Sequence, residues 1–247
     1  MAEKKIIPCL DMKEGSVVKG VHFVGIKKVG DLVERAKLYE KQGADEIAFL
    51  DIAATNENRK TRTDLVRKIS DNISIPLVVG GGIKSIEDIK EVLEAGASKV
   101  CINTAAVKDP ELIKKASEKF GKDKIIVAID FKDGFVYVKG GFEKTELDAV
   151  EWAIKAESLG AGAILPTSIG KDGTKAGYDI EITRKISESV SIPVIASGGA
   201  GTLEDIYNVL TEGKADAALA ASIFHYDKYT VKEVKDYLQK NGIDVKR

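Results

Sequence analysis

Residues 75–82 read Ile-Pro-Leu-Val-Val-Gly-Gly-Gly, and residues 192–199 read Ile-Pro-Val-Ile-Ala-Ser-Gly-Gly. The two stretches lie 117 residues apart, and residues 43–47 and 160–164 repeat at the same spacing. The run that ends at Asp11 matches the run that ends at Asp130, at a spacing of 119 residues. Because an internal repeat places equivalent residues at equivalent positions, we predict two halves with the same architecture.

Short apolar runs alternate with longer amphipathic stretches along the whole chain, a pattern typical of βα units and a parallel sheet. Each run predicts a strand that is buried on both faces. The predicted strands are 5–10, 46–51, 76–80, 99–103, 125–130, 163–168, 193–197 and 217–221. The predicted helices are 31–42, 62–71, 86–94, 110–119, 147–159, 180–189, 203–210 and 231–240.

The spacing of apolar residues supports the helices, and the number of units predicts the fold. In the predicted helix 147–159, Leu147, Val150, Ala153 and Ile154 form one apolar stripe. Eight βα units in 247 residues match the size of a closed (β/α)8 TIM barrel, here with an internal (βα)4 half-barrel repeat. A doubly wound open sheet is the alternative. Because no linker divides the halves, we expect residues 1–247 to form a single barrel domain.

Composition excludes several classes of protein. Acidic and basic residues number 39 and 38, for a net charge of −1, and neither sign gathers into a block that would attract nucleic acid or an anionic membrane. No apolar run approaches the roughly 20 residues that span a bilayer, and the first residues lack a signal-peptide core, so we expect a cytoplasmic protein. Cys9 and Cys101 predict reduced core residues rather than a metal site. We expect no metal and no organic cofactor.

Two aspartates end equivalent strands. Asp11 closes the first predicted strand and Asp130 the fifth, and these strands face each other across the mouth of an eight-stranded barrel. Opposed carboxylates can serve as acid and base when their surroundings separate their pKa values. The alternative is that each aspartate caps a loop or pairs with a lysine.

Glycine-rich turns follow the third and seventh predicted strands, at residues 80–83 and 198–201. Backbone N–H groups and a helix amino terminus can hold a phosphate at such turns. The fourth strand ends in Asn103-Thr104 and the eighth in Ala221-Ser222, so each half places a small polar side chain beside its glycines. We therefore predict two phosphate sites and a substrate that is phosphorylated at both ends.

Two long loops follow the first and sixth predicted strands. Residues 13–30 contain Lys19 and several glycines, which suits a mobile lid with cations for phosphate, and residues 170–177 form a second glycine-spaced loop. Each loop could equally be a plain solvated connection. His22 and His225 have no triad-like neighbours, so we expect them to be structural.

Taken together, the motifs resemble the cyclase subunit of imidazole glycerol phosphate synthase, a barrel enzyme of histidine biosynthesis, nearly from end to end. Isomerases of the same pathway share the half-barrel repeat and the two aspartates, but Cys9-Leu10-Asp11 and the ending at residues 222–225 are similar to the cyclase. The similarity rests chiefly on residues 6–11 (IIPCLD), 49–52 (FLDI), 79–83 (VGGGI), 102–106 (INTAA), 172–175 (DGTK), 195–201 (IASGGAG) and 220–225 (AASIFH).

The resemblance implies that a bisphosphorylated formimino carboxamide ribonucleotide and ammonia give imidazole glycerol phosphate and aminoimidazole carboxamide ribonucleotide. A glutaminase partner would supply the ammonia, and Asp11 and Asp130 would be the catalytic acid and base. The resemblance also assigns Lys19 to the lid, and Thr167 and Ser197 to the pocket between the phosphates. In the same way it implies that one phosphate is bound by Gly82, Asn103 and Thr104, and the other by Asp172, Gly173, Gly199 and Ser222.

At the other end of the barrel the family gates an ammonia passage with four charged residues. Lys5, Glu46 and Lys99 match three of them, but the fourth position holds Ala163. Ser98 stands where an acid often helps to anchor the glutaminase. The loop after the sixth strand also departs from the family, with Pro166 and Gly170. Two alternatives stay open: the aminoaldose–ketose isomerase of the pathway, and a catalytically silent bisphosphate-binding paralogue or engineered scaffold.

Overall fold

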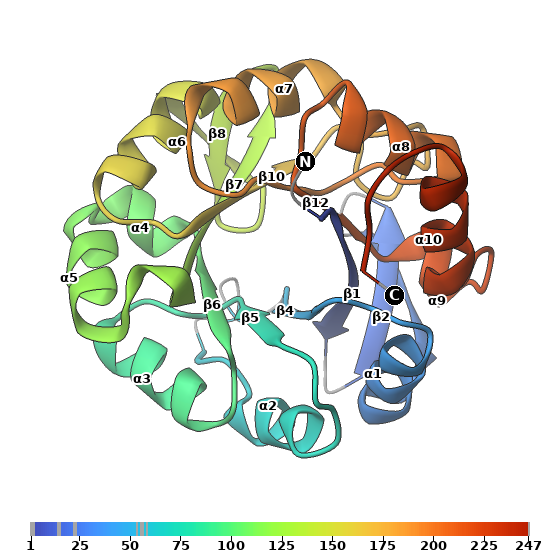
Figure 1. The fold of residues 1–247 in the computed structure, drawn as a ribbon. Coiled ribbons are helices and arrows are strands. Elements are labelled where there is room, and N and C mark those ends of the chain that lie inside the picture. Colours follow the sequence, from blue (N-terminus) through green and yellow to red (C-terminus); the bar gives the residue numbers. More distant parts are fainter. Residues whose placement is uncertain are drawn as a thin grey trace.

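The computed structural model describes residues 3–13, 16–21, 24–52, 54, 57 and 59–246, with backbone alone for residue 13 and for the stretches within 16–30. Eight parallel strands form a closed barrel with helices around it (Figure 1). Seven pairings join neighbours, and bridges at Ile164–Val194 and Thr167–Ser197 complete the ring between β10 and β11. In order around the barrel the strands are β1 (Lys5–Lys13), β4 (Ile47–Asp51), β5 (Leu77–Gly80), β6 (Lys99–Ile102), β7 (Ile125–Lys132), β10 (Ala163–Ser168), β11 (Ile195–Ala196) and β12 (Ala217–Ala220). The predicted TIM barrel is confirmed.

The helices form the outer layer, and the eight predicted ones are all present. They are α1 (Leu32–Lys41), α2 (Thr63–Ser70), α3 (Ile86–Glu94), α5 (Glu111–Phe120), α6 (Ala149–Ser158), α7 (Ile180–Ser189), α8 (Leu203–Thr211) and α10 (Val231–Lys240). Side-chain oxygens of Asp31, Ser85, Asp148, Thr202 and Thr230 accept bonds from the first backbone N–H groups of their helices, which fixes where those helices begin. The structure adds short helices α4 (Thr104–Lys108) and α9 (Ser222–His225) and a single 3-10 turn at Lys122–Lys124.

The apolar stripe predicted for helix 147–159 is confirmed in part. Ala153 is buried and Val150 packs against the core, but Leu147 belongs to a strand and is 36% exposed, and Ile154 is 44% exposed. The buried face of α6 is built from Ala149, Trp152, Ala153 and Ala156. The helix begins two residues later than predicted because Asp148 caps it, which leaves Leu147 outside the helix.

Antiparallel hairpins follow β1 and β7, the first strand of each half. They are β2 (Ser16–Val21) with β3 (Val24–Gly30), and β8 (Phe135–Val138) with β9 (Glu143–Asp148). The stretch predicted as a lid loop, 13–30, is therefore largely strand. The half-barrel repeat thus extends to these two insertions.

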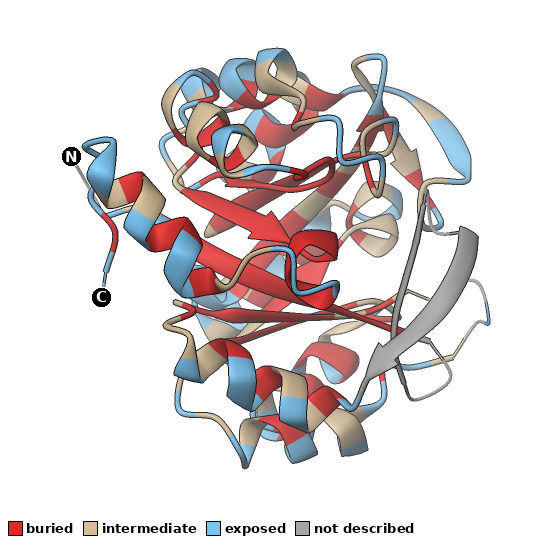
Figure 2. Cartoon of the chain, turned by 90° about the vertical axis from the view of Figure 1, so that its right-hand side faces the viewer, coloured by how far each residue is buried: buried red, intermediate tan, exposed pale blue. Residues whose placement is uncertain are grey.

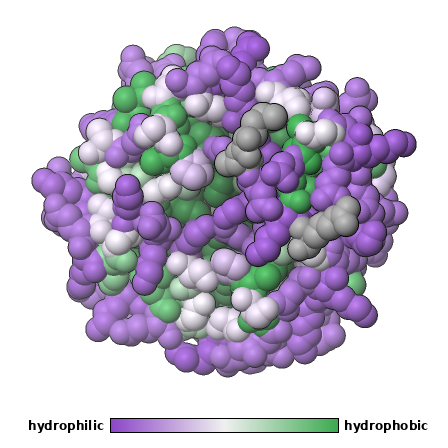
Figure 3. All heavy atoms as spheres, in the orientation of Figure 1, coloured by the Kyte–Doolittle hydropathy of each residue, from purple (hydrophilic) through white to green (hydrophobic). Residues whose placement is uncertain are grey.

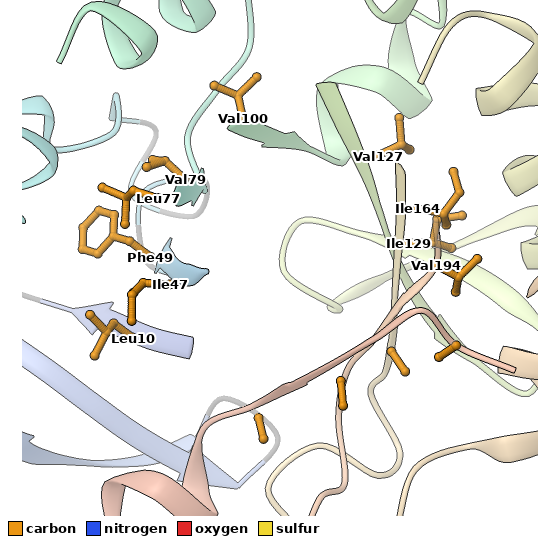
Figure 4. Packing of buried hydrophobic residues seen from close by; sticks show 14 of the residues in the cluster. Leu10, Ile47, Phe49, Leu77, Val79, Val100, Val127, Ile129, Ile164 and Val194 are labelled. Carbon is orange, nitrogen blue, oxygen red and sulfur yellow. The ribbon is translucent and has the colours of Figure 1, made fainter. Parts of the chain in front are cut away.

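The core has two layers, because successive residues of a strand face opposite ways. Residues that point outward pack under the helices, among them Leu10, Phe49 and Val79 (Figure 4). Residues that point inward fill the barrel, including Cys9 and Cys101, which are buried, reduced cysteines as predicted. In the side view of Figure 2 the buried strands run through the middle, and exposed residues lie on the outer faces of the helices.

Side chains also fasten neighbouring units at the end of the barrel where the strands begin, which we call the amino-terminal rim. Ser98 Oγ accepts the backbone N–H of Leu77 at 3.2 Å, and Asp216 accepts that of Val194 at 2.9 Å. The two contacts lie at equivalent places in the two halves. On the same rim Lys4 bridges to Val245, so both ends of the described chain meet there.

Candidate active site

A cavity of about 1000 Å³ opens at the end of the barrel where the strands finish. Residues from all eight barrel strands, or from the turns directly after them, line it. Its apolar floor includes Leu50, Ala128, Leu165 and Leu219. The polar side chains thus lie beside an apolar floor, where charges interact more strongly than in bulk water.

Asp11 and Asp130 both line this cavity, on strands β1 and β7, which lie opposite each other in the ring. Asp11 is 4% exposed, and its Oδ1 lies 3.2 Å from Cys9 Sγ, a thiol placed to donate a hydrogen bond. Asp130 Oδ2 accepts a hydrogen bond of 3.0 Å from Asn103 Nδ2. The two predicted carboxylates therefore share one cavity and have different neighbours.

Burial and, to a smaller extent, the negative charge of Asp172 raise the pKa of Asp130 from its usual value of 3.8, and the hydrogen bond from Asn103 opposes them, so that the pKa is about 7. A carboxyl group with this pKa holds its proton through mildly acidic pH and exchanges it near neutrality. It can therefore both donate and accept a proton at physiological pH.

The turn after β5 brings the first glycine-rich loop to the cavity. Gly81 and Gly82 have φ values of +93° and +75°, a region that favours glycine. A Cβ at Gly81 would meet the backbone oxygen of Asp51 at 2.2 Å. Asn103 and Thr104, at the start of α4, line the cavity with these glycines, so the predicted first phosphate residues lie together.

A half-buried ion pair supports that loop. Arg59 Nη2 donates to Asp51 Oδ1 at 2.7 Å, and Asp51 is 1% exposed. Thr61 donates its hydroxyl to the backbone oxygen of Gly81. The segment after β4 thereby holds the glycine turn of the next unit in place. This support was not predicted, although Asp51 ends a predicted strand as Asp11 does.

The second glycine-rich loop lies across the mouth. Gly198 and Gly199 have φ values of +88° and +111°, and a Cβ at Gly199 would meet the backbone oxygen of Gly177 at 2.1 Å. Asp172, Gly173 and Ser222 also line the cavity, together with Thr167 and Ser197 from between the two loops. Every predicted site residue at this end with a described side chain therefore faces one cavity.

The two residues named above in the loop after β1 give no site geometry. Lys19 lies in β2, and its side chain is outside the described part of the structure. His22 lies outside the described residues altogether. His225 is buried in α9, and its Nδ1 lies 2.7 Å from the hydroxyl of Tyr39, which agrees with the structural role predicted for it.

The structure adds cavity residues that the sequence analysis did not select. Lys84, Lys108, Lys139 and Phe142 all line the side of the first glycine loop. Lys139 and Phe142 belong to the turn between β8 and β9, and Phe142 is 67% exposed. The Lys-Gly-Gly sequence after an apolar pair at 137–138 was the available signal, since it is typical of a hairpin turn.

At the opposite end of the barrel Glu46 lies inside the ring. It is 2% exposed, and its Oε1 accepts hydrogen bonds of 2.7 Å from both Lys5 Nζ and Lys99 Nζ. Ala163, at the fourth predicted gate position, packs into the inner cluster and brings no charge. Figure 3 shows this face, where hydrophilic residues gather around the rim and hydrophobic ones show nearer the axis.

Among the described residues, no three or more His, Cys, Asp or Glu side chains are grouped so as to hold a metal ion. Likewise, none of the helices in this part of the chain is long and apolar enough to cross a membrane.

Comparison with known proteins agrees with this geometry. The model of the family described as "Histidine biosynthesis protein" matches residues 5–230. Three relatives carry the name "Imidazole glycerol phosphate synthase subunit HisF". The protein of Nostoc sp. (strain PCC 7120) is 56% identical over 100% of this chain and 98% of its own length. Those of Dehalococcoides mccartyi and Clostridium botulinum are 55% and 54% identical over 100% of this chain, and over 99% and 100% of their own lengths. The chain therefore belongs to the histidine biosynthesis protein family.

Proposed function

We propose that this chain is a cyclase of histidine biosynthesis in which Asp11 and Asp130 are the acid and base. The substrate is a formimino carboxamide ribonucleotide with a phosphate at each end, and the second reactant is ammonia. The products are imidazole glycerol phosphate and aminoimidazole carboxamide ribonucleotide. The relatives are named as subunits of the synthase, which favours the cyclase over the isomerase and over a silent scaffold.

The observation that carries the catalytic assignment is the pair of unlike carboxylates on opposite walls of one cavity. Ammonia addition, bond cleavage and ring closure each require proton transfers on different sides of the substrate. Asp130, whose pKa is about 7, can give a proton in one step and take it back in another. Asp11, beside Cys9 on the far wall, serves the opposite side of the same substrate.

The glycine-rich loops hold the two phosphates in this proposal. Gly82, Asn103 and Thr104 bind one, while Gly173, Gly199 and Ser222 bind the other, with Asp172 beside them. Backbone N–H groups at Gly82 and Gly199 can approach a phosphate closely because no Cβ stands in the way. Thr167 and Ser197 contact the middle of the substrate, and Lys19 keeps the lid role that the family resemblance implies.

We further propose that a glutaminase docks on the amino-terminal rim and delivers ammonia past Glu46, Lys5 and Lys99. The barrel interior between this gate and Asp11 is lined by the apolar inner cluster, including Ile7, Ala48 and Val78. An apolar passage admits neutral ammonia more readily than ammonium, whose charge is costly to bury. Purified glutaminase from a relative, added with glutamine, should then support turnover in place of ammonium salt.

The test of the catalytic pair is turnover of the bisphosphate substrate with ammonium salt at alkaline pH. Asp11→Asn and Asp130→Asn should each lower kcat by about 100-fold or more, the usual contribution of a general acid or base, with substrate binding little changed. Asp236→Asn on the outer helix α10 is the control, and it should retain wild-type kcat. Loss of binding rather than of turnover would make the two aspartates structural and refute the assignment.

A further inference from the structure

Three lysines on the first-phosphate side of the mouth have no role in the function proposed above. Lys84 follows the glycine turn after β5, Lys108 ends α4, and Lys139 begins the turn of the β8–β9 hairpin. All three are exposed side chains that line the cavity. Three different segments of the chain therefore bring positive charge to the first-phosphate side of the cavity.

The hairpin turn is fixed to the phosphate loop itself. The backbone N–H of Lys139 donates a hydrogen bond of 2.9 Å to Thr104 Oγ1, on the first residue of α4. Thr104 is also one of the residues proposed to bind phosphate. The contact brings Lys139 to the edge of that site, and Lys108 lies one helical turn along α4 from the same threonine.

Lys139 has a carboxylate partner in the free protein. Glu143 Oε2 lies 2.5 Å from Lys139 Nζ, and the two side chains are 52% and 48% exposed. The hydrogen bond and the charge of Lys139 lower the pKa of Glu143, and the charge of Lys108 adds a weaker effect in the same direction. Nearby Glu57, by contrast, is held by Arg59 at 2.6 Å. Glu143 is thus the counterion of Lys139, and Lys108 lines the cavity without an ion pair to this carboxylate.

We propose that Glu143 is an exchangeable counterion, and that Lys139 leaves it to bind, together with Lys108, the substrate phosphate held by the glycine loop after β5. An exposed Lys–Glu pair is weak, so little is lost when it opens. A phosphate ester carries close to two negative charges at neutral pH, against one on a carboxylate, and so competes well for both ammonium groups. This inference names cations for the first phosphate and rests on the proposed function.

The proposal predicts opposite effects from neighbouring residues. Lys108→Gln and Lys139→Asn should each lower kcat/KM about fivefold at low salt, the size of one Coulomb contact in water, while Glu143→Gln should raise it about two- to fivefold because the lysines lose their competitor. Asn suits position 139 because φ there is +55°. All three changes should leave kcat nearly unchanged, and the differences should shrink as salt screens the charges.

A matched pair on the opposite rim controls the experiment. Lys214 also has a φ of +55°, and its Nζ lies 2.6 Å from Glu188, whose side chain is 50% exposed. Lys214→Asn and Glu188→Gln should therefore leave kcat/KM with ammonium salt unchanged. The proposal is overturned if Glu143→Gln lowers kcat/KM or matches Glu188→Gln, or if the lysine variants match Lys214→Asn.

Binding of ribose 5-phosphate, measured by calorimetry, separates this inference from the proposed function. Binding that weakens in Lys108→Gln and tightens in Glu143→Gln would support the counterion exchange even if wild-type protein showed no turnover, in which case only the cyclase assignment fails. Normal turnover with the same affinity in all variants would overturn the exchange and leave the cyclase assignment intact.

Discussion

Replacing Asp130 by Asn removes a carboxyl group that the fold prefers to keep protonated. The pKa of Asp130 rises from 3.8 to about 7 because burial and the charge of Asp172 disfavour its ionised form. In the unfolded chain the same group ionises near its usual pKa. The variant keeps the shape of the side chain and an oxygen that can accept the hydrogen bond of 3.0 Å from Asn103.

The sign of the stability effect follows from proton binding. Between about pH 4 and pH 7 the folded state holds the Asp130 proton and the unfolded state has lost it, so this group makes unfolding progressively easier as the pH rises. This loss in the free energy of unfolding is complete above about pH 7 and absent below about pH 4. At 1.36 kcal/mol per pH unit, the rise from 3.8 to about 7 corresponds to about 4 kcal/mol at most. Because Asp130 is half-buried and lines an open cavity, solvent screens its charge and we expect about 1–2 kcal/mol.

Urea unfolding of wild type and Asp130→Asn at about pH 4.5 and about pH 8.5 measures this effect. The variant should gain free energy of unfolding at the higher pH and much less at the lower pH, while its turnover falls. Asp236→Asn, whose carboxylate is exposed on α10, should show no pH-dependent gain. A variant that is equally stable or less stable than wild type at the higher pH would refute the argument that burial disfavours the Asp130 charge.

Three further outcomes follow from contacts described above. In pH profiles of kcat/KM, Asp172→Asn should move the ionisation of Asp130 to lower pH, because the variant removes a neighbouring negative charge. Asn103→Ala should move it to higher pH, because the variant removes the hydrogen bond that lowers the pKa of Asp130. Shifts of both variants in the same direction would contradict these causes. Gly81→Ala should destabilise the protein by more than about 3 kcal/mol in urea unfolding, because its Cβ would lie 2.2 Å from the backbone oxygen of Asp51, whereas Gly134→Ala, with φ +81° and open space, should lose about 1 kcal/mol. Lys235→Met should lower the free energy of unfolding by about 3–5 kcal/mol, because it leaves the buried Asp45 carboxylate, 2.7 Å from Lys235 Nζ, without its cation. The double variant with Asp45→Asn should recover part of this loss in stability.

Buried strands and capped helices could be predicted from the sequence because their patterns are local. The predicted helices 86–94, 180–189 and 231–240 agree with α3, α7 and α10 at both ends. The hairpin strand β9 was missed because most of its residues are exposed, so no apolar alternation marks it. Helices α4 and α9 have five and four residues, too few to show a helical period.

The candidate site also has features that could be predicted from local sequence and features that could not. The placement of Asp11 and Asp130 at opposed strand ends was predictable because the repeat marks both ends. The positions of the glycine loops were predictable because their turns require glycine. The pKa of Asp130 was not predictable, since it depends on burial and on the charge of Asp172, which is far from Asp130 in the sequence. The cluster of Lys108, Lys139 and Glu143 depends on how a hairpin turn meets α4, a contact between residues 35 positions apart in the chain.

The bridge between Lys4 and Val245 has a practical consequence for work with this protein. A tag or fused domain attached at either end leaves the barrel on the rim opposite the substrate cavity, so it should not obstruct substrate entry. The same attachment crowds the surface where we expect the glutaminase to dock. Assays driven by ammonium salt should therefore tolerate tags at both termini, whereas assays driven by glutamine call for tag-free protein.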